Sequence, residues 1–323
     1  MTKTKNRVAY GLLLAILAAC GDRPDVDTGR YDELAKYYEN DVVADYPPEM
    51  AEYRQAFDNA AMPIAVADAR LARTSVYDSK FLGTPYMPPG FEYPRDPDGR
   101  ALSFLAQINF DDVPSLPDYP ESGILQFYIS DSSNDTNQVW GVEFVETTPY
   151  DAQAQFELQQ QPNYFRVVWH DTVVTDEDKL QTDHPGSDKL ELPVMGEAKL
   201  SFSEGIGYPV PGDYRFDKIF GAEGYEFFER FGDAADSVFV RYTSHITIDS
   251  VAWLGGYAFF TQWDPRYAEP DEDWLLLFEI QSWWEEGGPE VLWGDAGIGA
   301  FFIRREDLQA RDFSRVLYHW DNH

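Results

Sequence analysis

Leu292-Trp293-Gly294-Asp295-Ala296-Gly297-Ile298-Gly299-Ala300-Phe301-Phe302-Ile303 joins a glycine-rich turn that carries one carboxylate to a short, wholly apolar strand. An earlier stretch, Gly123-Ile124-Leu125-Gln126-Phe127-Tyr128-Ile129, repeats the order of glycine and apolar run at an offset of 297 − 123 = 174 residues. Apolar runs of this length, preceded by turn residues, are typical of buried strands. The two stretches therefore indicate two related β-rich units.

Two further blocks repeat at almost the same spacing. Residues 81–86 align with 253–258, and residues 105–109 align with 277–281, both at an offset of 172 (253 − 81 = 172). Three blocks in one order at nearly one offset indicate an internal duplication, with repeats near 79–130 and 251–304. We expect an α+β fold with a duplicated β-rich module, in which two related antiparallel-sheet halves pack as one domain.

The region before the repeats carries helical signals. Residues 31–38 and 50–72 carry helical signals, and apolar side chains in the second stretch recur at spacings of three and four. Pro63 should break or kink this second helix. Together the two stretches predict an N-terminal helical cap on the β-rich body. Residues 151–161 are rich in glutamine and suggest a turn or irregular segment. Strands are expected at 101–110, 123–129, 139–145, 164–169 and 198–202, and a later helix is expected at 225–231.

The first twenty residues predict the compartment. Lys3, Lys5 and Arg7 precede an apolar run that is too short to cross a bilayer and ends in Leu17-Ala18-Ala19-Cys20, as in a bacterial lipobox. Residues 1–19 then form a signal peptide, Cys20 is lipidated, and 20–30 form a tether to a single domain at 31–323. Such a protein is anchored to the membrane by its lipid in the bacterial cell envelope and faces the periplasm or exterior.

In a bacterium with two membranes, the absence of aspartate directly after Cys20 favours the outer membrane. The alternative is an ordinary secretory signal with an incidental cysteine.

The charge balance restricts the partners. The chain carries 57 acidic and 25 basic residues, a formal charge of −32. Nucleic acid and anionic headgroups attract basic surfaces, so we expect no nucleic-acid binding and consider a basic protein the best partner. The alternative is that the acidic surface only keeps the protein soluble.

Several motifs resemble one bacterial family. They include Ser79-Lys80-Phe81-Leu82-Gly83-Thr84-Pro85-Tyr86, Trp293-Gly294-Asp295-Ala296-Gly297 and Tyr318-His319-Trp320-Asp321. Together with the blocks between them, they resemble the YwqG-like family over about residues 75–321. The resemblance implies an α+β fold and no established activity. The chain departs from the family pattern at Ala258, where proline is usual, and at Gln281 and Ser282, where acids are usual, so a site built on those acids is in doubt.

Two groups in the second repeat are candidates for binding. Asp295 lies between glycines that would let a ligand approach, and Trp293 could stack on that ligand. Gln262, Asp264 and Arg266 form the other group. For both, a structural role is the alternative: Asp295 would cap a turn while Trp293 fills the core, and Asp264 would pair with Arg266 across a proline turn.

A polar layer crosses two apolar strands. Gln107 and Asn109 align in the repeat with Glu279 and Gln281. Because buried amides need partners, this layer is either a seam between the repeats or the floor of a pocket.

Recognised catalytic motifs are absent from the sequence. The five histidines show no metal-ligand spacing, and there is no GxSxG sequence. We therefore predict no metal, no cofactor and a non-catalytic binding module. The alternative is an envelope hydrolase that acts on glycans with paired carboxylates such as Asp264 and Asp295.

Overall fold

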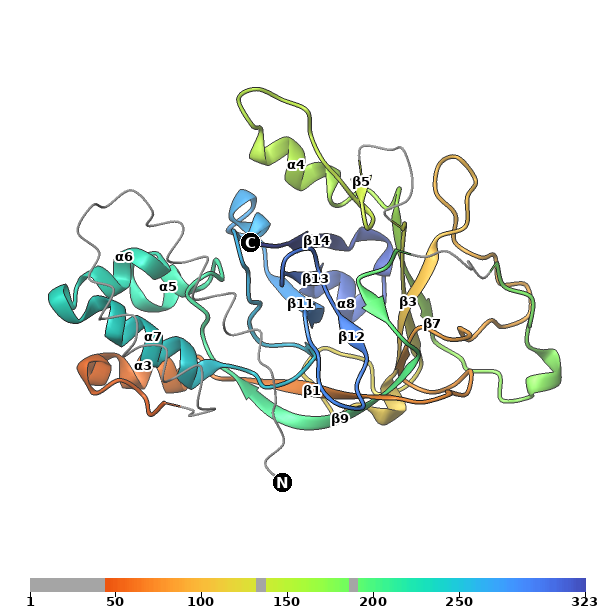
Figure 1. Ribbon diagram of the computed structural model, residues 1–323, viewed down its shortest axis with the longest axis horizontal. Helices are drawn as coiled ribbons and strands as arrows, with labels where there is room; N and C mark the ends of the chain where they lie inside the picture. The colour runs from red at the N-terminus through yellow and green to blue at the C-terminus, as the bar shows by residue number, and fades with distance from the viewer. Residues whose placement is uncertain (1–43, 132–137, 186–190) are drawn as a thin grey trace.

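The computed structural model describes residues 44–131, 138–185 and 191–323, and its centre is one large antiparallel sheet (Figure 1). The helix expected at 31–38 and Cys20, which is predicted to be lipidated, lie outside these residues. From one edge to the other, the ten strands are β14 (Leu317–Asp321), β13 (Ile298–Arg304), β11 (Trp274–Gln281), β10 (Ala252–Leu254), β1 (Met62–Leu71), β9 (Ala198–Gly207), β2 (Lys80–Phe81), β3 (Ser103–Asn109), β4 (Ile124–Ile129) and β7 (Phe165–His170).

The sheet curls until its two edges nearly meet. The ring of Phe165 on β7 lies 5.3 Å from the ring of Tyr318 on β14, and Trp169 lies 5.5 Å from Phe313. The side chains inside form one continuous hydrophobic core drawn from every strand of the large sheet. The prediction of a mixed fold built on an antiparallel sheet is confirmed.

Strands β1 and β9 lie between two four-stranded arms. One arm is β2-β3-β4-β7, and the other is β10-β11-β13-β14. The pairing of β3 with β4 shifts register between Phe104 and Ala106, and the pairing of β11 with β13 shifts between Leu276 and Phe278. The two shifts lie 276 − 104 = 172 residues apart, which is the offset between the repeated sequence blocks.

The helices are short and most of them gather beside the sheet. In Figure 1, α3 (Arg54–Asn59), α5 (Phe216–Phe220), α6 (Gly224–Glu229) and α7 (Ala235–Ile246) lie together on the left. Their buried faces form a second hydrophobic cluster, here called the helical cluster, which includes Met50, Phe57, Phe228 and Tyr242. The other α-helices are α4 (Ala152–Leu158) and α8 (Arg305–Ala310).

Short 3-10 helices and two small sheets complete the described chain. The 3-10 helices are η1 (Pro48–Tyr53), η2 (Phe110–Asp112), η3 (Glu177–Lys179), η4 (Gly232–Ala234), η5 (Pro265–Ala268) and η6 (Phe313–Arg315). One small sheet pairs β5 (Gln138–Val139) with β6 (Val142–Glu143), and the other pairs β8 (Val194–Met195) with β12 (Glu290–Val291).

The expected helix at 50–72 is wrong in its second half. Helical structure ends at Asn59, and Met62–Leu71 is the central strand β1. Ala65, Ala67 and Ala69 are buried on alternate residues, which is the period of a strand. In place of a helical cap formed by the N-terminus alone, the described segment 48–59 joins helices from the middle of the chain.

Two other segments also differ from expectation. Residues 152–158 form helix α4, because Asp151 accepts a hydrogen bond from the backbone N–H of Ala154 at 3.0 Å and caps it. The strand expected at 139–145 is a hairpin that turns at Trp140 and Gly141, both with positive φ.

Candidate functional site

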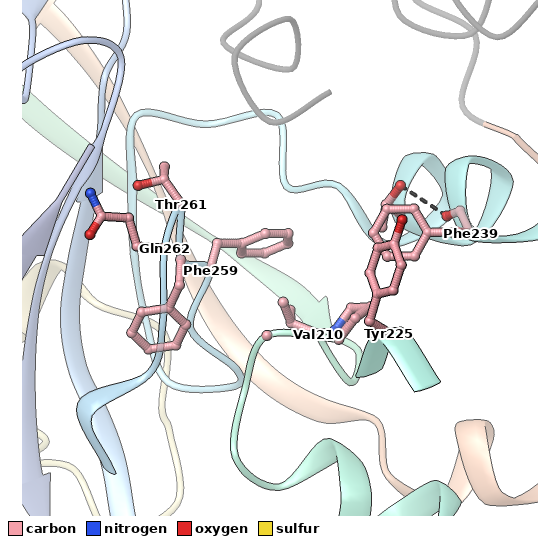
Figure 2. Close-up of a pocket in the computed structure, with 10 residues that line it drawn as sticks. Val210, Tyr225, Phe239, Phe259, Thr261 and Gln262 are labelled. Carbon is pink, nitrogen blue, oxygen red and sulfur yellow. Dashed lines mark hydrogen bonds between the residues drawn. The ribbon is translucent and has the colours of Figure 1, made fainter. Parts of the chain in front are cut away.

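An apolar groove lies between the helical cluster and the loop that follows β10 (Figure 2). Tyr225 of α6 and Phe239 of α7 line one side, and Phe259 lines the other. Its volume is about 240 Å³. An apolar cavity of roughly 150 Å³ holds benzene, so this groove has room for an aromatic side chain. The remaining lining residues are Val210, Pro211, Gly212, Thr243, Phe260, Thr261 and Gln262.

The helical wall of the groove is fixed by close packing. Tyr242 of α7 donates a hydrogen bond from its hydroxyl to the carbonyl of Pro209 at 2.7 Å. At Gly224, the first residue of α6, a Cβ atom would lie 2.0 Å from the carbonyl oxygen of Pro211, so only glycine allows this approach. At Gly212 a Cβ would lie 3.8 Å from Phe260, an ordinary contact. Position 212 can therefore carry a larger side chain next to Phe260 without backbone strain.

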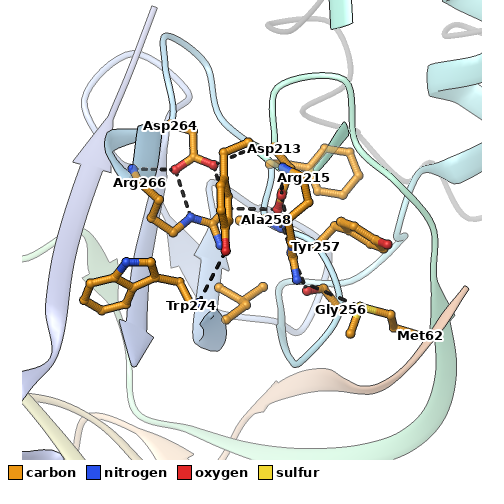
Figure 3. Close-up of polar contacts among 12 residues, drawn as sticks. Met62, Asp213, Arg215, Gly256, Tyr257, Ala258, Asp264, Arg266 and Trp274 are labelled. Carbon is orange, nitrogen blue, oxygen red and sulfur yellow. Dashed lines mark hydrogen bonds and ion pairs between the residues drawn. The ribbon is translucent and has the colours of Figure 1, made fainter. Parts of the chain in front are cut away.

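A buried ionic network holds the opposite wall (Figure 3). Arg266 Nη2 lies 2.7 Å from Asp264 Oδ2 and 2.9 Å from Asp213 Oδ2, and all three side chains are completely buried. Arg215 Nη2 lies 2.7 Å from Asp213 Oδ2 and also donates to the carbonyl of Gly256 at 2.9 Å. The network thus ties the chain that enters α5 to the loop that follows β10.

The charges of this network stabilise one another. Burial alone would raise the pKa of Asp213, but the guanidinium groups of Arg215 and Arg266 hold it well below its usual value. Burial would likewise lower the pKa of Arg266, but the carboxylates of Asp213 and Asp264 raise it. Asp213 and Arg266 therefore stay ionised and paired, and they serve as a support rather than as a titrating acid and base.

Two further carboxyl groups bind the backbone of the loop that follows β10 and lines the groove. Glu279 of β11 is completely buried and accepts a hydrogen bond from the N–H of Phe259 at 3.1 Å; burial raises its pKa well above the usual value. Asp321 of β14 accepts from the N–H of Thr261 at 3.1 Å and of Gln262 at 2.9 Å. Burial would raise the pKa of Asp321, yet the hydrogen bonds to its carboxylate lower it. The backbone of the loop is thereby fixed while its side chains face the groove.

The fold brings several of the predicted residues together. Gln262 lines the groove, and Asp264 and Arg266 lie in the network behind Phe260, whose ring is 5.6 Å from the Arg266 guanidinium carbon. Glu279 supports the same loop.

Gln107 and Asn109 lie in the other arm of the sheet. Gln107 is buried, accepts from the N–H of Tyr86 at 2.9 Å, and donates to the carbonyl of Val76 at 2.9 Å. Asn109 caps η2 through its side chain. The Gln107 side chain thus anchors the backbone of the loop before β3, and neither residue lines the groove.

Trp293 and Asp295 also lie apart from the groove. Trp293 is completely buried and packs against Trp140 and Trp320, with ring centroids at 5.8 and 6.3 Å. Asp295 is exposed on the turn before β13. Asp264 is completely buried in its ion pairs, so the two carboxylates do not share an open cleft.

Sequence reasoning missed much of the groove. Tyr225 is predicted only as part of the helix at 225–231, and no motif in the sequence singles out Phe239 or Gly212. Asp213 could not be linked to Arg266 because the two are 53 residues apart. Asp321 was visible as part of a family motif, but nothing in that motif indicated that it binds the backbone of Thr261.

In the part of the chain that the structure describes, no group of histidine, cysteine and acidic side chains is arranged to bind a metal ion. No helix within the same residues is long and apolar enough to cross a membrane.

The chain belongs to the family described as a domain of unknown function (DUF1963), whose model matches residues 79–322. This range contains the groove, the ionic network and the motifs that resemble the YwqG-like family. No curated protein matches the sequence.

Proposed function

We propose that this protein is a non-catalytic binding module and that its groove receives an apolar side chain of a partner protein. The observation that carries the proposal is the groove itself. It holds about 240 Å³ between aromatic walls, and the described residues that line it include no carboxylate, amine, thiol or imidazole. Such a groove offers burial of apolar surface, at about 25 cal/mol per Å². Its polar lining groups are the hydroxyls of Tyr225, Thr243 and Thr261 and the amide of Gln262.

The surface around the groove favours a basic partner. Glu223, Glu226 and Glu229 are exposed on and next to α6, and the whole chain has a formal charge of −32. Long-range attraction of this kind increases the rate of association with a cationic partner and repels nucleic acid.

The proposed place of action is the cell envelope. The lipobox ending at Cys20 supports anchoring by lipid, which would hold the groove at the membrane surface on the periplasmic or external side. Two acyl chains give stable anchoring, whereas one gives only marginal binding.

A glycan hydrolase remains the alternative from the sequence, but no feature of the described residues favours it. Glycosidases need two carboxyl groups that face each other across an open cleft at roughly 5–9.5 Å. Asp264 is buried in ion pairs with Arg266, and Asp295 lies on an exposed turn.

We also infer that the two arms of the sheet arose by duplication. The shared strand order and the matching register shifts support this inference. A further parallel is that the N–H of Tyr86 bonds to Gln107 in one arm and the N–H of Phe259 bonds to Glu279 in the other. One wall of the groove is the loop that follows β10 of the second arm, so the arms would have diverged in function.

The test uses a substitution that fills the groove. Gly212→Phe places a ring beside Phe260, while Gly212→Ala adds only a methyl group at the same position. The full chain would be recovered from detergent-solubilised envelopes after crosslinking. We expect a partner that is recovered equally by the wild type and Gly212→Ala and at least tenfold less by Gly212→Phe. Recovery of no partner, or of the same amount by both variants, would contradict the proposal.

A further inference from the structure

A second surface, separate from the groove, exposes apolar side chains. Leu71, Met195, Trp284 and Leu292 are 51, 47, 37 and 37% exposed. They are half of the eight large apolar side chains exposed in the described chain, and all four lie at or beside the small sheet of β8 and β12. Exposed apolar groups that gather in this way mark interaction sites more often than scattered ones do.

The hydrogen bonds of the small sheet explain why these side chains point outward. Trp283 and Val291 exchange two backbone hydrogen bonds, each at 2.8 Å, and both side chains are buried. Because side chains alternate along extended chain, their neighbours Trp284 and Leu292 face the opposite, exposed side.

The neighbouring chain extends this face. Met195 lies directly opposite Glu290 in the pairing of β8 with β12. Leu71 adjoins it, since its backbone N–H donates to the carbonyl of Gly287 at 3.0 Å and its side chain packs over Gly196. We call the surface formed by Leu71, Met195, Trp284, Glu290 and Leu292 the β8–β12 face.

One carboxylate without a charged partner among the described residues lies within the β8–β12 face. The side chain of Glu290 is exposed, and its carboxylate makes no ion pair or hydrogen bond with another described residue, whereas nearby Glu285 is paired with Arg70. A carboxylate surrounded by apolar side chains favours a cation of a partner, because the apolar contact around the pair excludes water and strengthens the attraction.

We propose that the β8–β12 face binds a partner protein that presents apolar side chains around a lysine or arginine placed opposite Glu290. A membrane is a poor occupant, because the exposed carboxylate of Glu290 would face anionic headgroups. A second copy of the chain is also a poor occupant, because the residues that define this face include no cation that a two-fold contact could place opposite Glu290. The proposal does not depend on the groove.

The test places a photo-reactive residue on this face in the full chain. Met195→p-benzoylphenylalanine and Leu292→p-benzoylphenylalanine report on the face, and the exposed Glu306→p-benzoylphenylalanine is the control. Each photo-reactive variant is made in the otherwise unchanged chain and in combination with Glu290→Lys. A third set combines it with Glu286→Lys, which makes the same change of charge and is the matched control. The crosslinked peptides are identified by mass spectrometry.

We expect positions 195 and 292 to crosslink to one partner segment that contains a lysine or arginine, and position 306 to give no such adduct. Glu290→Lys should lower the yield about tenfold, and Glu286→Lys should change it less than threefold. No adduct, an adduct with lipid or with a second copy of the chain, or a yield that Glu290→Lys leaves unchanged would overturn the proposal. If this face fails while Gly212→Phe still blocks recovery, only the second surface is disproved.

Discussion

Arg266 shows how a charged side chain can be fully buried in an acidic protein. Its guanidinium group bonds to Asp213 and Asp264, and its carbon lies 4.2 Å from the ring centre of Phe302. Removing one member of such a group is costly, because it leaves the other charges buried without compensation.

Arg266→Leu should therefore destabilise the protein by about 3–5 kcal/mol, measured by urea unfolding. The matched control is Arg54→Leu, which removes an exposed ion pair with Asp58 and should cost no more than about 1 kcal/mol. Equal losses for the two variants would show that the buried network does not stabilise the fold.

Glu279 should make stability depend on pH. Its pKa is raised in the folded protein, so the folded chain keeps a proton that the unfolded chain releases. The stability from this group is complete below the unfolded value of 4.5 and decreases as the pH rises toward the folded value, by about 1.4 kcal/mol per unit.

Glu279→Gln keeps an acceptor for the N–H of Phe259 but cannot titrate. The free energy of unfolding of Glu279→Gln, relative to that of the wild type, should therefore rise by about 1.4 kcal/mol per pH unit from pH 5 up to the pKa of Glu279 in the folded protein and stay constant above it, as measured by chemical unfolding at a series of pH values. A difference between the two proteins that stays constant with pH would contradict a raised pKa for Glu279.

The sequence predicted single residues better than it predicted their partners. The turn at Asp264, Pro265 and Arg266, with a pair between the acid and the base, could be expected from local spacing. That Asp213 completes the pair depends on the path of a long loop, which local spacing does not contain. The polar layer of Gln107 and Glu279 was visible, yet only the fold shows that these side chains bind backbone N–H groups.

At the scale of elements, apolar runs bounded by glycine were correctly predicted to be strands, whereas the alanine-rich segment 62–71 was wrongly predicted to be helical. The strands β3, β4 and β13 follow their apolar runs closely. Residues 62–71 have alanines that fit either period, and pairing with β9 and β10 on both sides selects the strand. Propensity alone cannot anticipate such tertiary pairing.

The glycines of the opening stretch are required for packing. At Gly297 a Cβ would lie 1.8 Å from the carbonyl oxygen of Asp321, and at Gly299 it would lie 2.3 Å from the ring of Trp293. The sequence suggested that glycines near Asp295 admit a ligand, whereas these two admit a neighbouring strand and a core tryptophan.

Gly297→Ala should separate β13 from β14 and lower the thermal stability, at a cost of about 2 kcal/mol or more, because a backbone oxygen cannot move away locally. Gly212→Ala, with its nearest contact at 3.8 Å, is the control and should melt within a few degrees of the wild type. The measurement is thermal unfolding, and equal melting temperatures for the two variants would disprove the close approach.

At the scale of the whole molecule, the chain combines a rigid, nearly closed sheet with a helical cluster beside it. The groove lies where these two parts meet. Its location could not be predicted from the sequence, because its walls come from segments that begin at Val210, Tyr225, Phe239 and Phe259.

The proposed anchor is tested by Cys20→Ser. Without the thiol no lipid can be attached, so the protein should move from the membrane fraction to the soluble fraction of disrupted cells. The control is the alanine variant of Gly212, which should stay with the membranes. A Cys20→Ser chain that sediments with membranes like the wild type would refute lipidation.

The most direct test of the groove is the affinity of the recovered partner for two variants that differ only in how far they fill it. Titration calorimetry would give the dissociation constants for Gly212→Ala and Gly212→Phe. We predict that Gly212→Phe binds at least tenfold more weakly, a loss of about 1.4 kcal/mol, while both variants unfold at the same denaturant concentration. Equal dissociation constants for the two folded variants would show that the partner does not use the groove.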